Sequence, residues 1–191
     1  VSEEDLFEYY EKVKEAYFNV FKRCGLDTYY ALASGGEFTI SNTHEFQALA
    51  DVGEDTIFYC PQCRNAENSE ISKLKEGDKC TGCEGSIFKG NAIEVGNIFP
   101  LGTKYSASFG LEFQDAAGKK KPVVMGSYGI GISRLMGTVV EIFNDKNGIR
   151  WPREVAPFGV HLVCLSSKKQ KVKRESDKMY GLLQKEGIEV L

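Results

Sequence analysis

The sequence lacks any long apolar run, any basic leader and any general excess of positive charge. No stretch of its 191 residues approaches the roughly 20 apolar residues that a membrane-spanning helix needs. The opening residues Val1-Ser2-Glu3-Glu4-Asp5 have neither the basic start nor the apolar stretch of a secretory signal. The net charge is −3. We therefore expect no membrane partner, and any contact with nucleic acid should come from a local basic patch.

An initiator methionine is also missing, so we expect the chain to begin inside a longer protein. Hydrophobic residues make up 42% of the sequence and charged residues 27%, a composition typical of folded domains and not of disordered ones. The length suffices for one ordinary core, or for one core with a small satellite.

The order of helix and strand signals predicts an α+β fold with an antiparallel sheet. A capping box at Ser2–Asp5, an apolar stripe from Leu6 to Phe21 and a stop at Gly25 predict a helix of about twenty residues. Further helices are expected over about 130–143 and 168–185. Strands, separated by glycine-containing turns, are expected at 29–34, 56–59, 91–99, 109–114 and 121–128, and a buried strand at 158–165.

Changes in composition divide the chain into four segments. Residues 60–90 are polar and glycine-rich, with too few apolar residues for a core of their own. Trp151-Pro152 and Pro157 mark a boundary near residue 150. We therefore expect a main domain made of 1–59 and 91–150, a small insertion at 60–90, and the beginning of a second domain at 151–191.

Four of the six cysteines form two pairs, Cys60-Pro-Gln-Cys63 and Cys80-Thr-Gly-Cys83, with sixteen residues between them. Two such knuckles can bring four thiolates to one tetrahedral ion, which would supply on the order of 10 kcal/mol of folding free energy. Four thiolates leave no open coordination position, so we predict a structural zinc site in a reducing, cytoplasmic protein. The alternatives are free thiols or a redox pair, which normally has one Cys-x-x-Cys at a helix start.

A glycine-rich turn from strand to helix is the main signal for a ligand site. Gly126, Gly129 and Gly131 remove side chains where an apolar strand enters a helix, so a flat ligand or a phosphate could approach the backbone. Arg134, in the first helical turn, could stack on a purine or hold phosphate oxygens. The pattern fits neither the dinucleotide fingerprint nor the phosphate loop. The alternative is close strand–helix packing with a solvated Arg134.

The run Gly126-Ser-Tyr-Gly-Ile-Gly-Ile-Ser-Arg134 resembles motif 3 of class II aminoacyl-tRNA synthetases. The run Glu94-Val-Gly-Asn-Ile-Phe-Pro-Leu-Gly-Thr-Lys-Tyr-Ser106 is similar to the segment that precedes motif 3 in bacterial-type prolyl-tRNA synthetases. Thr43-His-Glu-Phe46 and Gly53-Glu-Asp-Thr56 resemble the segment after motif 2, and Trp151-Pro152 resembles the entry into the anticodon-binding domain. The resemblance covers nearly the whole chain, apart from the interior of the cysteine segment.

This resemblance implies the class II antiparallel sheet flanked by helices, a four-cysteine zinc-knuckle insertion, and the start of an α/β anticodon-binding domain. The implied reaction joins proline and ATP into prolyl-adenylate and then transfers proline to tRNA(Pro), in a cytoplasmic homodimer. Motifs 1 and 2 would precede Val1, and most of the anticodon domain would follow Leu191, so we expect this chain alone to be inactive. The large editing insertion is missing, which implies no cis-editing of alanyl-tRNA.

The resemblance also implies roles for single residues. Arg134 would hold ATP and stabilise the charge that develops at the α-phosphate, as the catalytic residue. The implied ATP site consists of Thr103, Gly129, Gly131, Arg134 and Glu94, the last as a Mg²⁺ ligand. The implied proline site consists of His44, Ser127 and Gly129. Lys168, Lys169 and Lys171 would contact tRNA phosphates, with a solvated helix face as the alternative.

Three positions depart from the bacterial pattern, because Ser127, Pro100 and Asn97 stand where Cys, Gln and His are usual. Two other functions stay open. One is a class II synthetase for threonine, serine or histidine, and the other is a non-catalytic synthetase-like or zinc-ribbon module that binds RNA.

Overall fold

The computed structural model describes residues 2–39, 41–165 and 168–191. It consists of two compact units, Val1–Arg150 and Trp151–Leu191, which are treated separately below. Among the described residues, no helix has both the length and the apolar character needed to cross a membrane.

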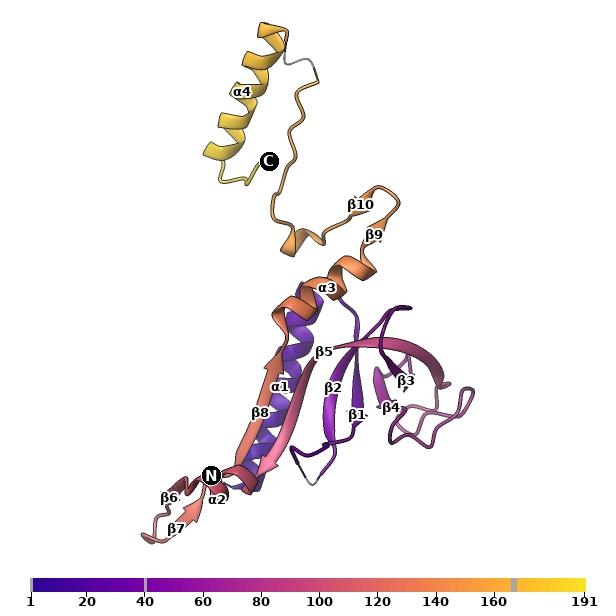
Figure 1. Cartoon of the computed structure of the whole chain (residues 1–191), viewed down its shortest axis with the longest axis vertical. Helices are drawn as coiled ribbons and strands as arrows, with labels where there is room; N and C mark the ends of the chain where they lie inside the picture. Colours follow the sequence, from indigo (N-terminus) through magenta and orange to yellow (C-terminus); the bar gives the residue numbers. More distant parts are fainter. Residues whose placement is uncertain (1, 40, 166–167) are drawn as a thin grey trace. The chain divides into compact units, whose positions relative to one another are not determined.

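Helix α1 (Glu3–Arg23) confirms the first helix that the sequence predicts. It begins where the Ser2 hydroxyl accepts a hydrogen bond from the backbone N–H of Asp5 at 3.1 Å. It ends before Gly25, whose φ of 80° is the left-handed conformation that glycine adopts without strain. The buried side of α1, which includes Tyr17 and Phe21, packs on strands β5 (Phe88–Gly102) and β8 (Met125–Ile130) (Figure 1).

The first unit contains a six-stranded sheet in the order β2-β1-β4-β3-β5-β8. Its strands are β1 (Thr28–Ala33), β2 (Thr43–Leu49), β3 (Asp55–Tyr59), β4 (Asn65–Asn68), β5 (Phe88–Gly102) and β8 (Met125–Ile130). The predicted antiparallel pairing is confirmed for every neighbouring pair except β1 and β4, which run parallel. Because β5 also pairs with β2, strands β2, β1, β4, β3 and β5 close into a ring.

Strand β5 makes this closure possible because its 15 residues serve three partners. It pairs with β3 along Phe88–Ala92, with β2 along Ala92–Ile98, and with β8 along Gly96–Gly102. The turn between β2 and β3 lies directly on it, since a Cβ atom on Gly53 would be 2.3 Å from the carbonyl oxygen of Ala92. Only glycine fits there without moving the backbone.

Apolar side chains lie on both faces of the sheet. On the α1 side, the ring of Phe46 is fully buried among the rings of Tyr17, Phe18 and Phe21. A second cluster fills part of the strand ring, and its buried members are Tyr29, Ala31, Ile57, Ala66 and Ala92. The two clusters fix the sheet from both sides and so position the ends of β5 and β8.

Several local predictions differ from the structure. Of the strand expected at 109–114, only Glu112–Gln114 is extended, because Phe109 still belongs to helix α2 (Lys104–Phe109), which ends at the left-handed Gly110. A short hairpin of β6 (Glu112–Gln114) and β7 (Lys120–Pro122) follows. Helix α3 (Ile132–Ile142) confirms the helix after the glycine-rich turn, and the hairpin of β9 (Asn144–Asp145) and β10 (Gly148–Ile149) ends the unit.

The second unit contains a 3-10 turn, η1 (Arg153–Val155), and helix α4 (Gln170–Lys185), which confirms the predicted basic helix. The prediction of a buried strand at 158–165 is wrong. Its described residues form only one bridge, between Val160 and Val190, and the side chains of Val163 and Leu165 are 60% and 90% exposed. An apolar run becomes a buried strand only when neighbouring elements cover it, and the described part of this unit does not provide them.

Candidate nucleotide-binding cleft and cysteine site

An open cleft of about 410 Å³ lies where β5, β8 and the start of α3 meet. Glu94 and Asn97 from β5, Gly129 from β8, and Gly131 and Arg134 from the turn into α3 line it. Four residues of the predicted ATP site, Glu94, Gly129, Gly131 and Arg134, therefore lie around one cleft.

Two glycines keep the floor of this cleft free of side chains. A Cβ atom on Gly129 would be 3.2 Å from the Asn97 amide oxygen, and one on Gly131 would be 3.3 Å from the Cβ atom of Arg134. Gly131 is also the residue from which α3 begins. Backbone groups at the start of a helix are suited to a negatively charged ligand.

Arg134 provides a permanent positive charge at the rim of the cleft. Its side chain is half exposed, and Nη1 donates a hydrogen bond to Oε1 of Glu54 at 2.9 Å. Glu54 belongs to the turn between β2 and β3 and lies 80 positions before Arg134 in the sequence. A guanidinium has five N–H donors, so most of them stay available to a ligand.

Glu94 places a carboxylate in the same cleft, where one of its oxygens accepts a hydrogen bond from the Asn97 amide at 2.7 Å. The carboxylate is half-buried. Oxygen ligands of this kind suit Mg²⁺, which usually takes one or two carboxylates together with the phosphates of its nucleotide. The chemistry of this side chain therefore fits the predicted metal role.

A buried polar network on the same side of the sheet was not foreseen from the sequence. The Gln47 amide donates to the carboxylates of Glu45 at 2.9 Å and Asp55 at 2.7 Å, and the Asn68 amide donates to Glu45 at 3.3 Å. Burial raises the pKa of Glu45 to about 7, helped by the charge of Glu94 and opposed by the hydrogen bond from Gln47. The available signal was the alternation of Glu45 and Gln47 with apolar residues along one strand.

The structure does not bring together His44 and Ser127, two of the residues predicted to bind the substrate proline. His44 pairs with Ile98 and Ile98 with Tyr128, so these three side chains share the α1 side of the sheet, and Ser127 lies on the other. The Tyr10 hydroxyl lies 2.9 Å from His44 Nδ1, and the ring of Tyr30 stacks on the imidazole. Burial, with the nearby charge of Lys14, lowers the pKa of His44 to about 4.

Thr103 lies apart from the cleft that contains Arg134. It precedes α2 and lines a different cavity, of about 430 Å³, with Leu6, Thr39 and Pro100. This cavity lies at the C-terminal end of β5, whereas Glu94 lies near the middle of the strand. The ATP role of Thr103 and the proline roles of His44, Ser127 and Gly129 stay predictions.

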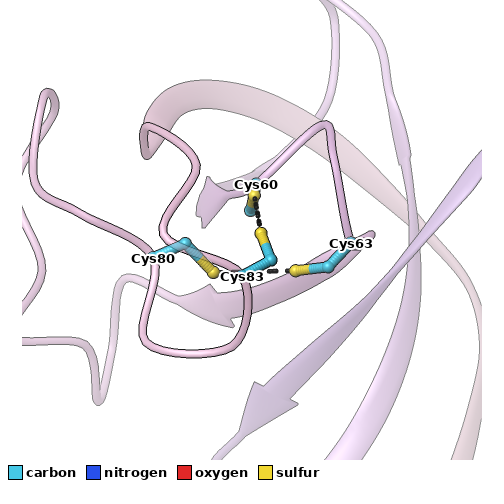
Figure 2. A group of neighbouring side chains, drawn as sticks. All are labelled: Cys60, Cys63, Cys80 and Cys83. Atoms are coloured by element: carbon cyan, nitrogen blue, oxygen red, sulfur yellow. Dashed lines mark hydrogen bonds between the residues drawn. The ribbon is translucent and has the colours of Figure 1, made fainter.

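The four paired cysteines form one compact group (Figure 2). Their sulfur atoms all lie within 4.8 Å of one another, with Cys60 and Cys83 at 3.4 Å and Cys63 and Cys80 at 3.6 Å. A tetrahedral ion with metal–sulfur bonds of about 2.3 Å keeps its sulfurs about 3.8 Å apart. The donor set and its spacing therefore fit zinc.

The two cysteine turns have the same backbone hydrogen bonds. The N–H of Cys60 donates to Asn65 at 2.9 Å and that of Cys80 to Gly85 at 2.6 Å. The residue after each pair, Arg64 or Glu84, donates back to the first cysteine and has a φ near +60°. Non-glycine residues rarely adopt this conformation, so its repetition indicates a site built to hold four sulfurs.

Lys168, Lys169 and Lys171 are exposed at the beginning of α4, in the second unit. Farther along the helix, Lys173 pairs with Asp177 at 3.0 Å on the solvent side. The lysines form a local basic patch of the kind that the sequence suggested, and their contact with tRNA stays a prediction.

Comparison with known proteins agrees with this geometry. The family model of the tRNA synthetase class II core domain (G, H, P, S and T) matches residues 1–143. The proline-tRNA ligase of Sulfurimonas denitrificans is 32% identical over 209 aligned residues, which cover 100% of this chain and 48% of the relative. That of Halothermothrix orenii is 47% identical over 122 residues, covering 64% of this chain and 21% of the relative. The chain thus spans about half, or less, of these relatives.

A similar fold is found in the crystal structure of prolyl-tRNA synthetase from Cryptosporidium parvum complexed with L-proline and AMP. The TM-score is 0.66 at 17% sequence identity, over 100% of this chain and 33% of the other. Together with the family match over residues 1–143, these similarities establish that the chain belongs to the class II aminoacyl-tRNA synthetases and is similar to the proline-tRNA ligases among them.

Proposed function

We propose that this chain is part of a proline-tRNA ligase, which activates proline with ATP as prolyl-adenylate and transfers it to tRNA(Pro). The observation that carries this proposal is the cleft in which Arg134 stands over a floor formed by Gly129 and Gly131. A synthetase-like module that only binds RNA would not need a permanent cation above a floor without side chains. The similarity to named proline-tRNA ligases favours proline among the possible amino acids.

The cleft residues have distinct roles in this proposal. Arg134 would bind phosphate oxygens of ATP and neutralise charge as the proline carboxylate attacks the α-phosphorus atom. Glu94, held by Asn97, would bind Mg²⁺, which supplies further neutralisation of the phosphates. Gly129 and Gly131 would let the nucleotide lie against the backbone. His44, Ser127 and Thr103 keep their proposed roles next to proline and ATP.

The partners of the whole enzyme belong to the same proposal. Cys60, Cys63, Cys80 and Cys83 would hold a structural zinc ion, since four sulfurs leave no position for a reacting water. Cysteines that are not joined in disulfides, as a zinc site requires, persist in a reducing compartment such as the cytoplasm. Residues 151–191 would begin the anticodon-binding domain, with Lys168, Lys169 and Lys171 near tRNA phosphates. The full-length enzyme would act as a homodimer.

Amino-acid-dependent exchange of pyrophosphate into ATP, measured with the full-length protein, tests the proposal. Proline should support exchange, and Arg134→Ala should lower kcat/KM by about 100- to 1,000-fold. Arg150→Ala, at an exposed position at the end of the same unit, is the matched control and should leave exchange unchanged. Exchange with threonine, serine or histidine instead of proline would reject the substrate, and no exchange with any amino acid would reject the activity.

A further inference from the structure

We propose that Glu54 is a positioning residue for Arg134, which holds the guanidinium over the cleft before the nucleotide arrives. The inference rests on the proposed function, because it assigns a ligand-orienting role at the same cleft. It concerns a residue that neither the glycine-rich turn nor the cleft lining contains. Its basis is the 2.9 Å contact between Arg134 Nη1 and Glu54 Oε1.

Glu54 is presented by a turn that cannot move freely. Gly53 packs so closely on β5 that its Cβ position is 2.3 Å from the Ala92 carbonyl oxygen. The backbone N–H of Ala50 donates to Asn91 at 3.1 Å, and that of Gly53 donates to Ala50 at 2.9 Å. The next residue, Asp55, already pairs with Ala92 in the sheet. The backbone on either side of Glu54 is therefore fixed on the strand that also carries Glu94.

Arg134, in contrast, has little to hold its long side chain. In the part of the chain that the structure describes, Glu54 is its one ion-pair partner, and half of the arginine side chain is exposed. An exposed pair of this kind adds little to the stability of the fold. Its effect should instead be on orientation, because it removes rotamers that point away from the cleft.

The contact occupies one nitrogen of the guanidinium and leaves the others for the ligand. A nucleotide that meets a pre-oriented arginine does not have to order that side chain upon binding. Loss of this pre-orientation should weaken nucleotide binding by about two- to tenfold, the range for ordering one long side chain. The chemical step should change little, since Glu54 does not need to touch the reacting atoms.

Pyrophosphate exchange by the full-length protein, with ATP and proline varied separately, gives the first test. We expect Glu54→Ala to raise the KM for ATP by about two- to tenfold, with kcat and the KM for proline nearly unchanged. Glu54→Gln keeps the length and an oxygen acceptor, so it should restore part of the loss. Asp51→Ala, which removes the same charge from the same turn, is the control and should behave like the wild type.

Calorimetric binding of the Mg²⁺ complex of a non-hydrolysable ATP analogue gives a second test that needs no turnover. The dissociation constant should rise in Glu54→Ala by the same factor as the KM. An unchanged or lower value would overturn the inference, since a lower value would mean that Glu54 competes with the phosphates. A fall in kcat and a rise in the KM for proline, each as large as the rise in the KM for ATP, would also overturn the inference, because such a pattern indicates general damage to the protein. Wild-type binding without proline-dependent exchange would reject the proposed function alone.

Discussion

His44 and Glu45 are neighbours in β2 whose protonation should affect stability in opposite directions. Burial lowers the pKa of His44 from 6.5 to about 4 on the α1 side of the sheet, and raises that of Glu45 from 4.5 to about 7 on the other. We predict that their effects on the free energy of unfolding largely cancel between pH 4.5 and 6.5. Replacing either residue by glutamine should expose the effect of the other.

The direction follows from which state holds the extra proton. Between pH 4.5 and 7 the folded chain keeps a proton on Glu45 that the unfolded chain has lost, so this contribution is complete below pH 4.5 and is lost as pH rises to 7. Between pH 4 and 6.5 the unfolded chain holds the extra proton on His44, so that contribution is complete above pH 6.5 and is lost as pH falls to 4.

The size of each effect follows from the pKa change. Folding changes the pKa of each residue by about 2.5, and at 1.36 kcal/mol for a pKa change of one this sets an upper limit of about 3.4 kcal/mol on each contribution to the free energy of unfolding. Both side chains keep partial contact with solvent, which screens the interactions. We therefore expect each effect to be about 1–2 kcal/mol.

Urea unfolding followed by circular dichroism at pH 4.5, 5.5, 6.5 and 7.5 would measure these effects. Relative to the wild type, Glu45→Gln should gain stability as pH rises, and His44→Gln should gain stability as pH falls. The double variant should have a pH profile parallel to that of the wild type, offset by a constant. Single-variant profiles parallel to the wild type would refute the assignment of these two pKa values.

Three further predictions concern packing. Phe46→Ala should lower the free energy of unfolding by about 3–5 kcal/mol, because it removes a fully buried ring among four others, and urea unfolding would measure the loss. Gly53→Ala should lower the free energy of unfolding by about 3 kcal/mol, because the added Cβ atom would collide with the backbone of Ala92. Gly137→Ala on α3, where no atom lies near the added Cβ atom, should instead raise it by about 1 kcal/mol. Equal melting temperatures of the two variants would contradict the close approach of Gly53 to β5. Gly85→Ala should weaken zinc binding more than Gly82→Ala, in competition with a chromogenic chelator, because its Cβ atom would lie 3.1 Å from the Cys60 sulfur, against 3.9 Å from the nearest sulfurs for Gly82.

The features that sequence predicted well are those whose signals are local. The capping box at Ser2 and the apolar stripe behind it define α1, because both the start and the buried face of a helix are set within a few turns. The grouping of Gly129, Gly131 and Arg134 was predictable for a similar reason, since they span six residues of one strand-to-helix turn, whereas Glu94 was placed with them by the family resemblance.

The features that sequence missed depend on partners far along the chain. Strand β4 reads Asn-Ala-Glu-Asn, with no residue of high strand propensity, and is extended because β1 and β3 bind it on both sides. Glu54 looks like an ordinary exposed residue of a glycine turn until α3 brings Arg134 next to it. The apolar residues at 158–165 illustrate the reverse case, because a strand-like pattern found no neighbours to cover it.

The cysteine segment cannot be treated as a removable appendage, because it contributes β4 to the ring. A shortened chain that joined Tyr59 to Phe88 would release the hydrogen-bonding groups of β1 at Tyr30–Leu32 and of β3 at Ile57–Tyr59. Two unprotected sheet margins of this kind invite strand addition from neighbouring molecules. Such a trimmed protein should therefore self-associate, even if every residue of the cleft were retained.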